Sequence, residues 1–415
     1  MTLALAVYHP LRSGHILLKP SAVLDASALE RLREFKVASL WVRYPALDFL
    51  ARYTNPRLLA QHAELAASLS TGFESATRRA HAPMDYRQYA GAVAALLDAI
   101  MEAPQAAIFL HEVTGGAGAT GPLMAHSANV CFLSLLLGLK LDTYMLQQRR
   151  NVPAHRAKRT ESLGLGALLH DVGMLHLAPN VLEHYLNTGD LKDPEVRRHV
   201  LLGYEMVRGK IPPTAASVVL HHHQRTDGTG FPQIPRLDGI RRALAGRQIH
   251  IFSRIVAVAD MFDRLRHPPS ARAPGEPPPE PLPAVCALRQ LLELARRRVI
   301  DPVVFKALCE VAPAYAPGSV VTLNDGRTAV VTAWDAEQPC RPAVRPIIQL
   351  NPLQPTESTV GQTLDLRTDI TLEIAACDGH PTLESNFYPL TPGAPATDTG
   401  PEHEIRTTPR PRSAA

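Results

Sequence analysis

Apolar residues recur at three- and four-residue spacing through the middle of the chain. Five stretches rich in alanine and leucine carry this pattern, at residues 57–69, 86–101, 123–141, 165–175 and 194–207. Such spacing puts apolar side chains on one face of a helix, and alanine and leucine favour helix formation. The pattern therefore predicts a helical domain, which we bound at residues 56–312.

The two ends of the chain show different patterns. Residues 1–55 combine a turn signal, a helix-like stretch with Asp25 and Ser27 as candidate caps, and the apolar, β-branched stretch 37–44. Residues 313–380 contain two β-type runs on either side of residues 324–326, and further β-type runs follow. We therefore predict a mainly α protein with a small N-terminal α/β module and a small C-terminal β-rich module.

Two proline-rich segments interrupt these patterns. Residues 267–284, HPPSARAPGEPPPEPLPA, hold too much proline for a helix or a central strand. Residues 381–415 lack the apolar content that a folded segment needs. We expect the first to be an exposed loop inside the helical domain and the second to be a disordered tail.

Composition narrows the class of protein. The 415 residues are 46% hydrophobic, and 43 Lys and Arg stand against 39 Asp and Glu with no long block of one sign. This balance indicates folded domains without a DNA, RNA or membrane surface. The five cysteines form no CxxC pair, which favours a reducing compartment. The apolar run VCFLSLLLGL covers about half of the ~20 residues that a membrane-spanning helix needs, so we expect a cytoplasmic protein.

Ionisable residues recur within the apolar stretches that are predicted to be helical. Those with apolar neighbours are His126, His170, Asp171, His199, His222, His223 and Asp260. Singly, each histidine fits a hydrogen-bonded core residue, and a His-Asp pair at a helix end fits a helix terminus followed by a turn. Together they favour a metal site, because buried ionisable groups are rare unless they are paired or bound to metal. Imidazole and carboxylate ligands without cysteine suit Mn, Fe, Co, Ni or Zn.

The order and spacing of these residues resemble the HD-GYP subgroup of the HD phosphohydrolases. The matching motifs are His126-Ser127, His170-Asp171-x-Gly173, His199-x-x-x-Gly203, His222-His223-x-x-x-Asp227-Gly228-x-Gly230-Phe231-Pro232, and RIVAVADMFD with Asp260 and Asp263. The resemblance covers roughly residues 120–310, and the combined signature is specific. It implies an HD-type helical bundle that holds two or three metal ions and hydrolyses cyclic di-GMP to pGpG or GMP.

The resemblance also implies metal ligands. One metal would be held by His126, His170 and Asp260, and the other by His199, His222 and His223. Asp171 would bridge them, because a carboxylate offers two oxygens. We expect two divalent transition metal ions, Fe or Mn, with His170 and Asp171 as the catalytic residues. Such a pair of cations generates a hydroxide and neutralises charge on a phosphodiester. His221 matches no family ligand, and we expect it at the surface or behind the ligands.

Several positions depart from the family pattern. The family lysine that contacts the substrate phosphate is replaced by Met174, whose thioether carries no charge and donates no proton. Gln224 replaces a glutamate, and Phe231 replaces the tyrosine of the GYP tripeptide. Pro122 stands where some members have a glutamate for a third metal. We therefore expect two metals and a reduced activity.

The substrate-binding residues are less complete than the metal ligands. The family's arginine-proline-tyrosine segment is missing, so we assign the clamping of a phosphate loosely to Arg266 or Arg272. Arg225, Asp227 and Phe231, in the turn that follows the paired histidines, complete the expected substrate contacts.

Three functions remain open from the sequence. The first is a metal-dependent phosphodiesterase that acts on a cyclic dinucleotide in bacterial second-messenger signalling. The second is a catalytically weak or inactive relative that senses the nucleotide or binds signalling proteins such as diguanylate cyclases. The third is an HD hydrolase acting on another phosphoester. The end modules fit regulatory, packing or dimerisation roles, which leaves an oligomer open.

A competing signal lies in residues 116–121. Gly116-x-Gly118-x-x-Gly121 matches the dinucleotide fingerprint in form and follows residues 106–113, which look like a strand. No parallel βαβ series accompanies it, and Pro122 follows the last glycine. We therefore interpret the segment as a loop, near the mouth of the site.

Overall fold

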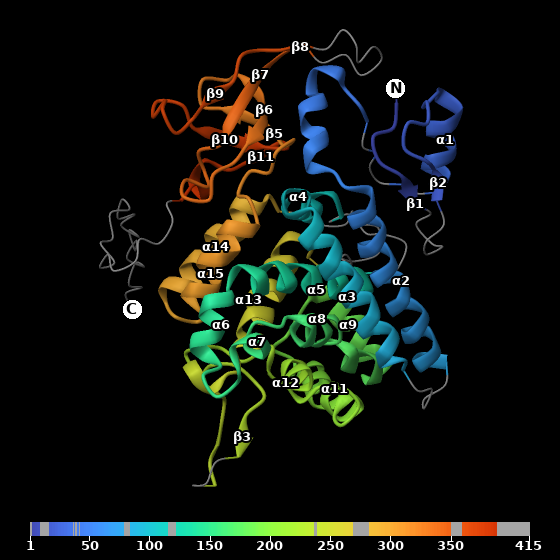
Figure 1. Cartoon of the computed structure of the whole chain (residues 1–415), viewed down its shortest axis with the longest axis vertical. Helices are drawn as coiled ribbons and strands as arrows, with labels where there is room; N and C mark the ends of the chain where they lie inside the picture. Colours follow the sequence, from blue (N-terminus) through green and yellow to red (C-terminus); the bar gives the residue numbers. More distant parts are fainter. Residues whose placement is uncertain are drawn as a thin grey trace, which may run out of the picture.

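The chain forms a helical body, with a small β sheet and a small N-terminal module toward one end of it (Figure 1). A computed structural model of the chain describes residues 2–8, 16–35, 37, 40, 42–78, 84–114, 122–235, 239–268, 282–349 and 359–387. Within these residues the predicted mainly α architecture, with an α/β module and a β-rich module at its ends, is confirmed.

The helical body runs from residue 56 to residue 311. Its first helices are α2 (Pro56–Arg78), α3 (Tyr86–Glu102), α4 (Pro104–Thr114), α5 (Pro122–Lys140), α6 (Asp142–Gln148), α7 (Ala154–Ala157) and α8 (Glu161–Leu168). They are followed by η2 (Val172–His176), α9 (Pro179–Thr188), α10 (Pro194–Arg197), α11 (His199–Val207), α12 (Pro213–His221), η3 (Gly246–Gln248), α13 (Ile251–Arg266), α14 (Ala284–Arg296) and α15 (Pro302–Val311).

Local sequence signals mark where many of these helices begin. Proline is the first residue of α9, α10, α12 and α15, a position where its missing N–H breaks no helical hydrogen bond. Asp85, Asp193 and Asp301 accept hydrogen bonds from amides in the first turns of α3, α10 and α15. The first residue of each helix determines which of the following side chains face the core.

Helix α5 lies at the centre of the body and packs against α2, α8, α13 and α15. Its stretch Leu123–Lys140 is long and apolar enough to cross a membrane, but 72% of that stretch is buried inside the protein. The helix extends beyond its apolar run and also buries the polar residues Ser127, Asn129 and Ser134. It is a core helix, and it carries His126 near its N-terminal end.

The N-terminal module has a hydrophobic core of its own. Strands β1 (Val7–Tyr8) and β2 (Ile16–Leu18) pair antiparallel, and α1 (Ala26–Glu34) packs with them. The predicted cap is present, because Asp25 accepts a hydrogen bond from the Ala28 amide at 2.7 Å. In the apolar, β-branched stretch 37–44, Val42 pairs with Leu3 in an isolated antiparallel β-bridge. The 3₁₀ helix η1 (Pro45–Tyr53) leads into the helical body.

The C-terminal module is an antiparallel sheet. Its strands are β5 (Val320–Leu323), β6 (Thr328–Ala333), β7 (Ala343–Gln349), β8 (Thr359–Val360), β9 (Leu364–Asp365), β10 (Ile374–Cys377) and β11 (His380–Pro381). The order is β11-β10-β5-β6-β7-β8, and β9 also pairs with β7. The predicted turn between β5 and β6 contains Gly326 at a φ of 87°, which suits glycine. The core of the sheet is continuous with that of the helical body.

Two expectations about local structure are wrong. Residues 106–113, which looked like a strand, lie in α4, where Ala106, Ala107 and Phe109 are buried. The strand that a dinucleotide fingerprint requires is therefore missing, and residues 116–121 lie outside the described residues. Residues 381–387, which we assigned to the tail, pack on the sheet: Phe387 is buried, and Asn386 accepts a hydrogen bond from Tyr315 Oη at 2.6 Å. Residues 269–281 and 388–415 lie outside the described residues.

Candidate metal centre

Five segments of the helical body bring the expected ligands together. They are α5 with His126, the turn after α8 with His170 and Asp171, α11 with His199, the end of α12 with His222 and His223, and α13 with Asp260. All seven residues are buried or nearly so, and the side chain of His126 keeps 12% exposure. The sequence signature thus corresponds to one compact cluster.

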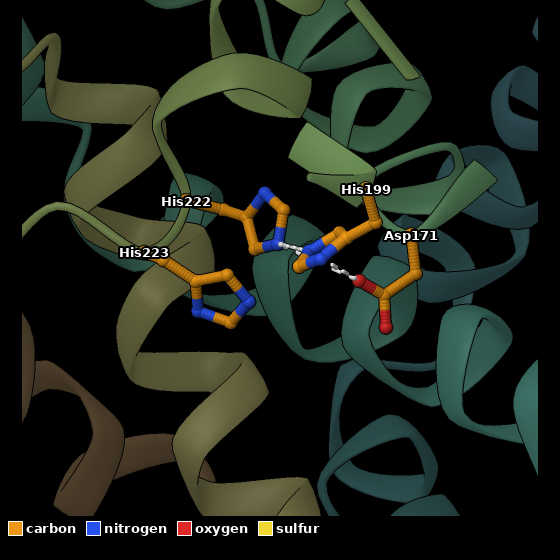
Figure 2. A group of neighbouring side chains, drawn as sticks. All are labelled: Asp171, His199, His222 and His223. Atoms are coloured by element: carbon orange, nitrogen blue, oxygen red, sulfur yellow. Dashed lines mark hydrogen bonds and ion pairs between the residues drawn. The ribbon is translucent and has the colours of Figure 1, made fainter. Parts of the chain in front are cut away.

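One group of possible ligands consists of Asp171, His199, His222 and His223 (Figure 2). One ligand atom from each lies within 4.8 Å of the others. Asp171 Oδ1 is 3.3 Å from His199 Nε2 and 3.5 Å from His222 Nε2, and the two Nε2 atoms are 3.4 Å apart. The side chains converge on a common point, as metal ligands do.

Backbone carbonyls accept hydrogen bonds from Nδ1 of three histidines of the cluster, His170, His199 and His222. Nδ1 lies 2.7 Å from Ala167 O in His170, 2.7 Å from Val196 O in His199 and 3.0 Å from Val219 O in His222. A carbonyl oxygen only accepts, so each Nδ1 donates its proton. In the neutral ring of His199 the Nε2 lone pair is then directed at the cluster, which is the arrangement of metal-bound histidines.

Several polar atoms in the cluster are buried without a hydrogen bond. These atoms are His170 Nε2, Asp171 Oδ1 and His223 Nε2. Buried polar groups are nearly always paired, and a metal ion is one explanation for groups that are not. The donor set and these orphaned atoms fit a divalent transition metal ion at Asp171, His199, His222 and His223.

The second group of possible ligands consists of His126, His170 and Asp171, with Asp260 close by. Asp171 Oδ2 lies 3.4 Å from His170 Nε2 and 3.9 Å from His126 Nε2, and Asp260 Oδ1 lies 3.0 Å from His126 Nε2. Asp171 therefore turns one carboxylate oxygen to each group. This is the bridging position that the resemblance implied for it.

Two residues of α13 that the sequence analysis gave no role complete the second group. Asp263 Oδ2 lies 2.6 Å from His126 Nδ1, and its Oδ1 accepts a hydrogen bond from Asn129, so it orients the His126 ring. Arg264 donates from Nε to Asp260 Oδ1 at 2.6 Å and from Nη2 to Asp171 Oδ2 at 2.8 Å. Their positions three and four residues after Asp260 place them on its helix face, a signal present in the sequence.

The charges of the cluster follow from burial and close partners. Burial alone would raise the pKa of the Asp171 carboxyl, but the charges of His170 and Arg264 hold it well below its usual range. Burial alone would lower the pKa of His170, but Asp171 and Asp260 raise it to about 10. For His199 the effect of burial dominates and lowers the pKa to about 4. Asp171 is thus ionised, and His199 is a neutral ring suited to bind metal.

Glycines allow the close approach of the ligand-bearing segments. A Cβ atom at Gly173 would lie 1.9 Å from His199 O and 2.5 Å from Gly203 N. At Gly230 it would lie 2.4 Å from His223 O. The glycines of the two motifs therefore let η2 pack on α11 and let the turn fold back on His223, which brings Asp171 to His199.

The expected substrate-binding residues occupy different surroundings. The Phe231 ring lies 4.6 Å from the His223 ring, at the edge of the cluster, and the guanidinium of Arg197 lies 4.9 Å from the Phe231 centroid. Sequence reasoning missed Arg197. Arg225 and Asp227 are exposed on the turn, where Asp227 accepts hydrogen bonds from the amide and hydroxyl of Thr229.

Other expected residues lie away from an open site. Arg266 is 8% exposed and donates to Leu282 O at 2.8 Å, so it secures that segment and is not the open phosphate clamp we expected. Met174 is fully buried in the hydrophobic core. His221 faces Ser217 Oγ at 3.2 Å, and its Nε2 is buried, so it lies behind the ligands. Arg272 lies outside the described residues.

Gln224 bridges two parts of the chain. It is 2% exposed, its amide donates to Pro232 O at 2.7 Å, and its carbonyl accepts from the Leu244 amide at 2.9 Å. A carboxylate could not donate the first of these bonds. The glutamine that departs from the family pattern thus holds the turn around Phe231.

Comparisons with known proteins identify a matching domain family and several similar proteins. Residues 123–265 match the family model described as HD domain. The chain is 30% identical over 225 residues to a cyclic di-GMP phosphodiesterase of Pseudomonas aeruginosa, covering 53% of this chain and 46% of that protein. It is 38% identical over 107 residues to the cyclic di-GMP phosphodiesterase response regulator RpfG of Xanthomonas campestris, covering 24% and 25%.

Two further proteins are similar to this chain. The 3'3'-cGAMP-specific phosphodiesterase 3 of Vibrio cholerae is 33% identical over 147 residues, covering 34% of this chain and 27% of that protein. A solved structure of Bd1817, described as an HDG"Y"P protein from Bdellovibrio bacteriovorus, is 18% identical and aligns with a TM-score of 0.44 over 75% of this chain and 95% of that one. The chain spans less than half the length of the three curated relatives. With its complete set of signature histidines and aspartates, the chain carries an HD domain of the HD-GYP type.

Proposed function

We propose that this protein is a metal-dependent phosphodiesterase that hydrolyses cyclic di-GMP to pGpG or GMP in bacterial second-messenger signalling. The observation that carries the proposal is the position of Asp171. One of its oxygens lies beside His199 and His222, and the other lies beside His170, so that one carboxylate joins two groups of histidines. The names of the three curated relatives, which are phosphodiesterases of cyclic dinucleotides, support the substrate class.

The residues of the cluster have separable tasks in such a reaction. Bound at the cluster, Fe or Mn would supply a water of lowered pKa and neutralise charge on the phosphodiester. The carbonyl contacts of His199 and His222 place a proton on Nδ1 and direct Nε2 at the centre. The ionised Asp171 would supply negative charge that helps to hold the cation.

Substrate contacts come from the edge of the cluster. Phe231 lies against His223 and offers an aromatic face, on which a guanine base could stack. Arg197 places a positive charge at the same edge, where it can pair with a phosphate oxygen. We propose these two residues, with Arg225 and Asp227 of the exposed turn, as the substrate contacts.

A second candidate function is a nucleotide sensor or protein-interaction module of low activity. The burial of Met174 in the core favours it, because no cation can reach the substrate from the position of the family lysine. The loss of a charge-assisted phosphate contact costs about 1.5–3 kcal/mol, or roughly 10- to 100-fold in rate. One such loss slows the reaction without abolishing it, so we place the enzyme first.

Chromatography of the reaction products tests the proposal. The full chain is incubated with cyclic di-GMP, and separately with 3'3'-cGAMP, in the presence of Mn²⁺ or Fe²⁺, beside Asp171→Ala and His221→Ala. We expect linear dinucleotide or mononucleotide from the wild type and His221→Ala, and none from Asp171→Ala. Bound metal and bound nucleotide without any product would contradict the enzyme and support the sensor. Absence of bound metal would contradict the enzyme and the assignment of the metal ligands.

A further inference from the structure

We propose that the Arg264 guanidinium occupies the place of the second metal ion, so that the chain holds one metal, at Asp171, His199, His222 and His223. The other group, His126 and His170 with Asp260, then contains the positively charged guanidinium in place of a metal ion. This inference rests on the metal-binding part of the proposed function. It revises the expectation of two metals.

The carboxylate oxygens of the second group are already bound. Arg264 Nε donates to Asp260 Oδ1 at 2.6 Å, and Nη2 donates to Asp171 Oδ2 at 2.8 Å. These are the same oxygens that lie nearest to the Nε2 atoms of His126 and His170. A metal at this position would have to displace both hydrogen bonds and would lie beside the positive charge of the guanidinium.

The position of Arg264 is built into the fold. It lies one helical turn after Asp260 on α13, so the first contact forms within the helix. Its guanidinium carbon is 5.5 Å from the ring centroid of Tyr185, which is 2% exposed on α9. With two hydrogen bonds, a ring contact and a side chain only 18% exposed, the guanidinium is held from three directions.

The first group offers the opposite surroundings. Asp171 Oδ1 and His223 Nε2 are buried there without hydrogen bonds. In the second group His126 already contacts Asp263 and Asp260 through its two ring nitrogens, at 2.6 and 3.0 Å. His170 Nε2 makes no hydrogen bond, but the carboxylate oxygens beside it are those that Arg264 holds. A cation is therefore needed in one group and supplied by the chain in the other.

Arginine and a metal ion differ in what they do for hydrolysis. Both neutralise carboxylates and attract phosphate oxygens, but a guanidinium has no coordination site for water and stays protonated. The nucleophile would then come from the single metal beside Asp171. The Arg264 cation would fix the orientation of Asp171 and offset the charge of the carboxylates.

Metal counting tests the inference. The metal-free full chain is dialysed against excess Mn²⁺ at neutral pH, and bound manganese per chain is measured by mass spectrometry together with the electron paramagnetic resonance spectrum. The variants are Arg264→Ala and Arg264→Met, the second of which keeps the aliphatic stem on Tyr185. Arg197→Ala is the control, since it removes a nearby arginine that touches no ligand carboxylate. Circular dichroism establishes that each variant is folded.

We expect one manganese and a mononuclear spectrum in the wild type and in Arg197→Ala. In a folded Arg264 variant we expect two manganese ions and an exchange-coupled spectrum. Two ions in the wild type, or a count that stays at one in the folded Arg264 variants, would overturn the inference. No metal in any variant would overturn it together with the proposed function. Counts of one and two without hydrolysis by any variant would support it and contradict only the proposed activity.

Discussion

The Asp171 carboxylate accepts a hydrogen bond from the Arg264 guanidinium at 2.8 Å, although the two residues are 93 positions apart in the chain. Asp171 follows α8, and Arg264 lies on α13, so the contact joins two of the helical segments that supply the candidate ligands. It keeps one carboxylate oxygen occupied and leaves the other, Oδ1, turned to His199. Asp171 is thereby the residue that connects the two groups of candidate ligands.

Substitution of Asp171 by asparagine should therefore remove metal. The amide keeps the shape of the side chain but removes the negative charge, and it presents one acceptor oxygen where there were two. We expect a loss of metal affinity of at least roughly 100-fold, because the loss of a ligand exceeds the 10- to 100-fold cost of losing a group behind a ligand. Isothermal titration of Mn²⁺ into the metal-free variant measures it. Unchanged affinity would exclude Asp171 as a ligand.

Substitution of Gly173 by alanine should separate η2 from α11. The added Cβ would lie 1.9 Å from His199 O, which is backbone and cannot rotate away. We expect a loss of stability of about 1–3 kcal/mol, or more, as found for overpacked cores, together with weaker metal binding. Urea unfolding of the metal-free protein measures the loss of stability.

The control for this substitution is Gly91→Ala. Gly91 lies on α3 with no atom within 4 Å of an added Cβ, so alanine there should be neutral or stabilising, by up to about 1 kcal/mol. Equal stability of Gly173→Ala and Gly91→Ala would contradict the close packing of η2 on α11.

His250, at the start of α13, should make the stability of the metal-free protein depend on pH. Burial, with the charges of Arg149 and Arg254 nearby, lowers the pKa of His250 to about 4. In the unfolded chain a histidine titrates near pH 6.5. The stabilisation is thus complete above pH 6.5 and is lost as the pH falls toward 4, because the unfolded chain then binds more protons.

His250→Asn isolates this effect. Nδ1 of His250 accepts a hydrogen bond from the Phe252 amide, and asparagine can keep such a cap without titrating. Between pH 6.5 and 5 the wild type should lose about 1.5 kcal/mol more stability than the variant, since one pKa unit corresponds to about 1.4 kcal/mol and the unfolded histidine is half protonated at pH 6.5. Urea unfolding at the two pH values gives the difference. Parallel losses in the two proteins would show that His250 does not titrate as proposed.

Arg197 should contribute to substrate binding and not to metal binding. Its guanidinium lies on Phe231 beside His223, and it contacts none of the candidate ligands in the structure. We expect Arg197→Ala to raise the KM for cyclic di-GMP about 10-fold, the cost of one charge-assisted contact, with its metal content unchanged. Steady-state kinetics with metal analysis tests this. An unaltered KM would remove Arg197 from the substrate site.

Much of the candidate site could be predicted from the sequence, because its ligands lie in short motifs with apolar flanks. His222 and His223 are adjacent, and His170 precedes Asp171, so local order already indicated which residues would meet. What the motifs did not contain was harder to predict. Arg197 reaches Phe231 only through the packing of α10 beside the turn, which no spacing in the sequence reveals.

The choice of Arg266 as a phosphate clamp failed for a geometric reason. Two residues along an α-helix correspond to a rotation of about 200°, so Arg264 and Arg266 lie on nearly opposite faces of α13. Arg264 shares a face with Asp260 and enters the cluster, whereas Arg266 turns to the carbonyl of Leu282. Counting positions from Asp260 would have identified Arg264 from the sequence alone. Residues 106–113 were misjudged because a short apolar run fits a strand as well as a buried helix.

The most direct test of the account follows product formation during metal titration. Mn²⁺ is added stepwise to the metal-free full chain, and hydrolysis of cyclic di-GMP is measured by chromatography at each ratio, beside Asp171→Asn. We expect no product without metal, a rise of activity with bound manganese, and no activity of the variant at any ratio. Hydrolysis by the metal-free protein, or no hydrolysis by a wild type with its metal bound, would contradict the account.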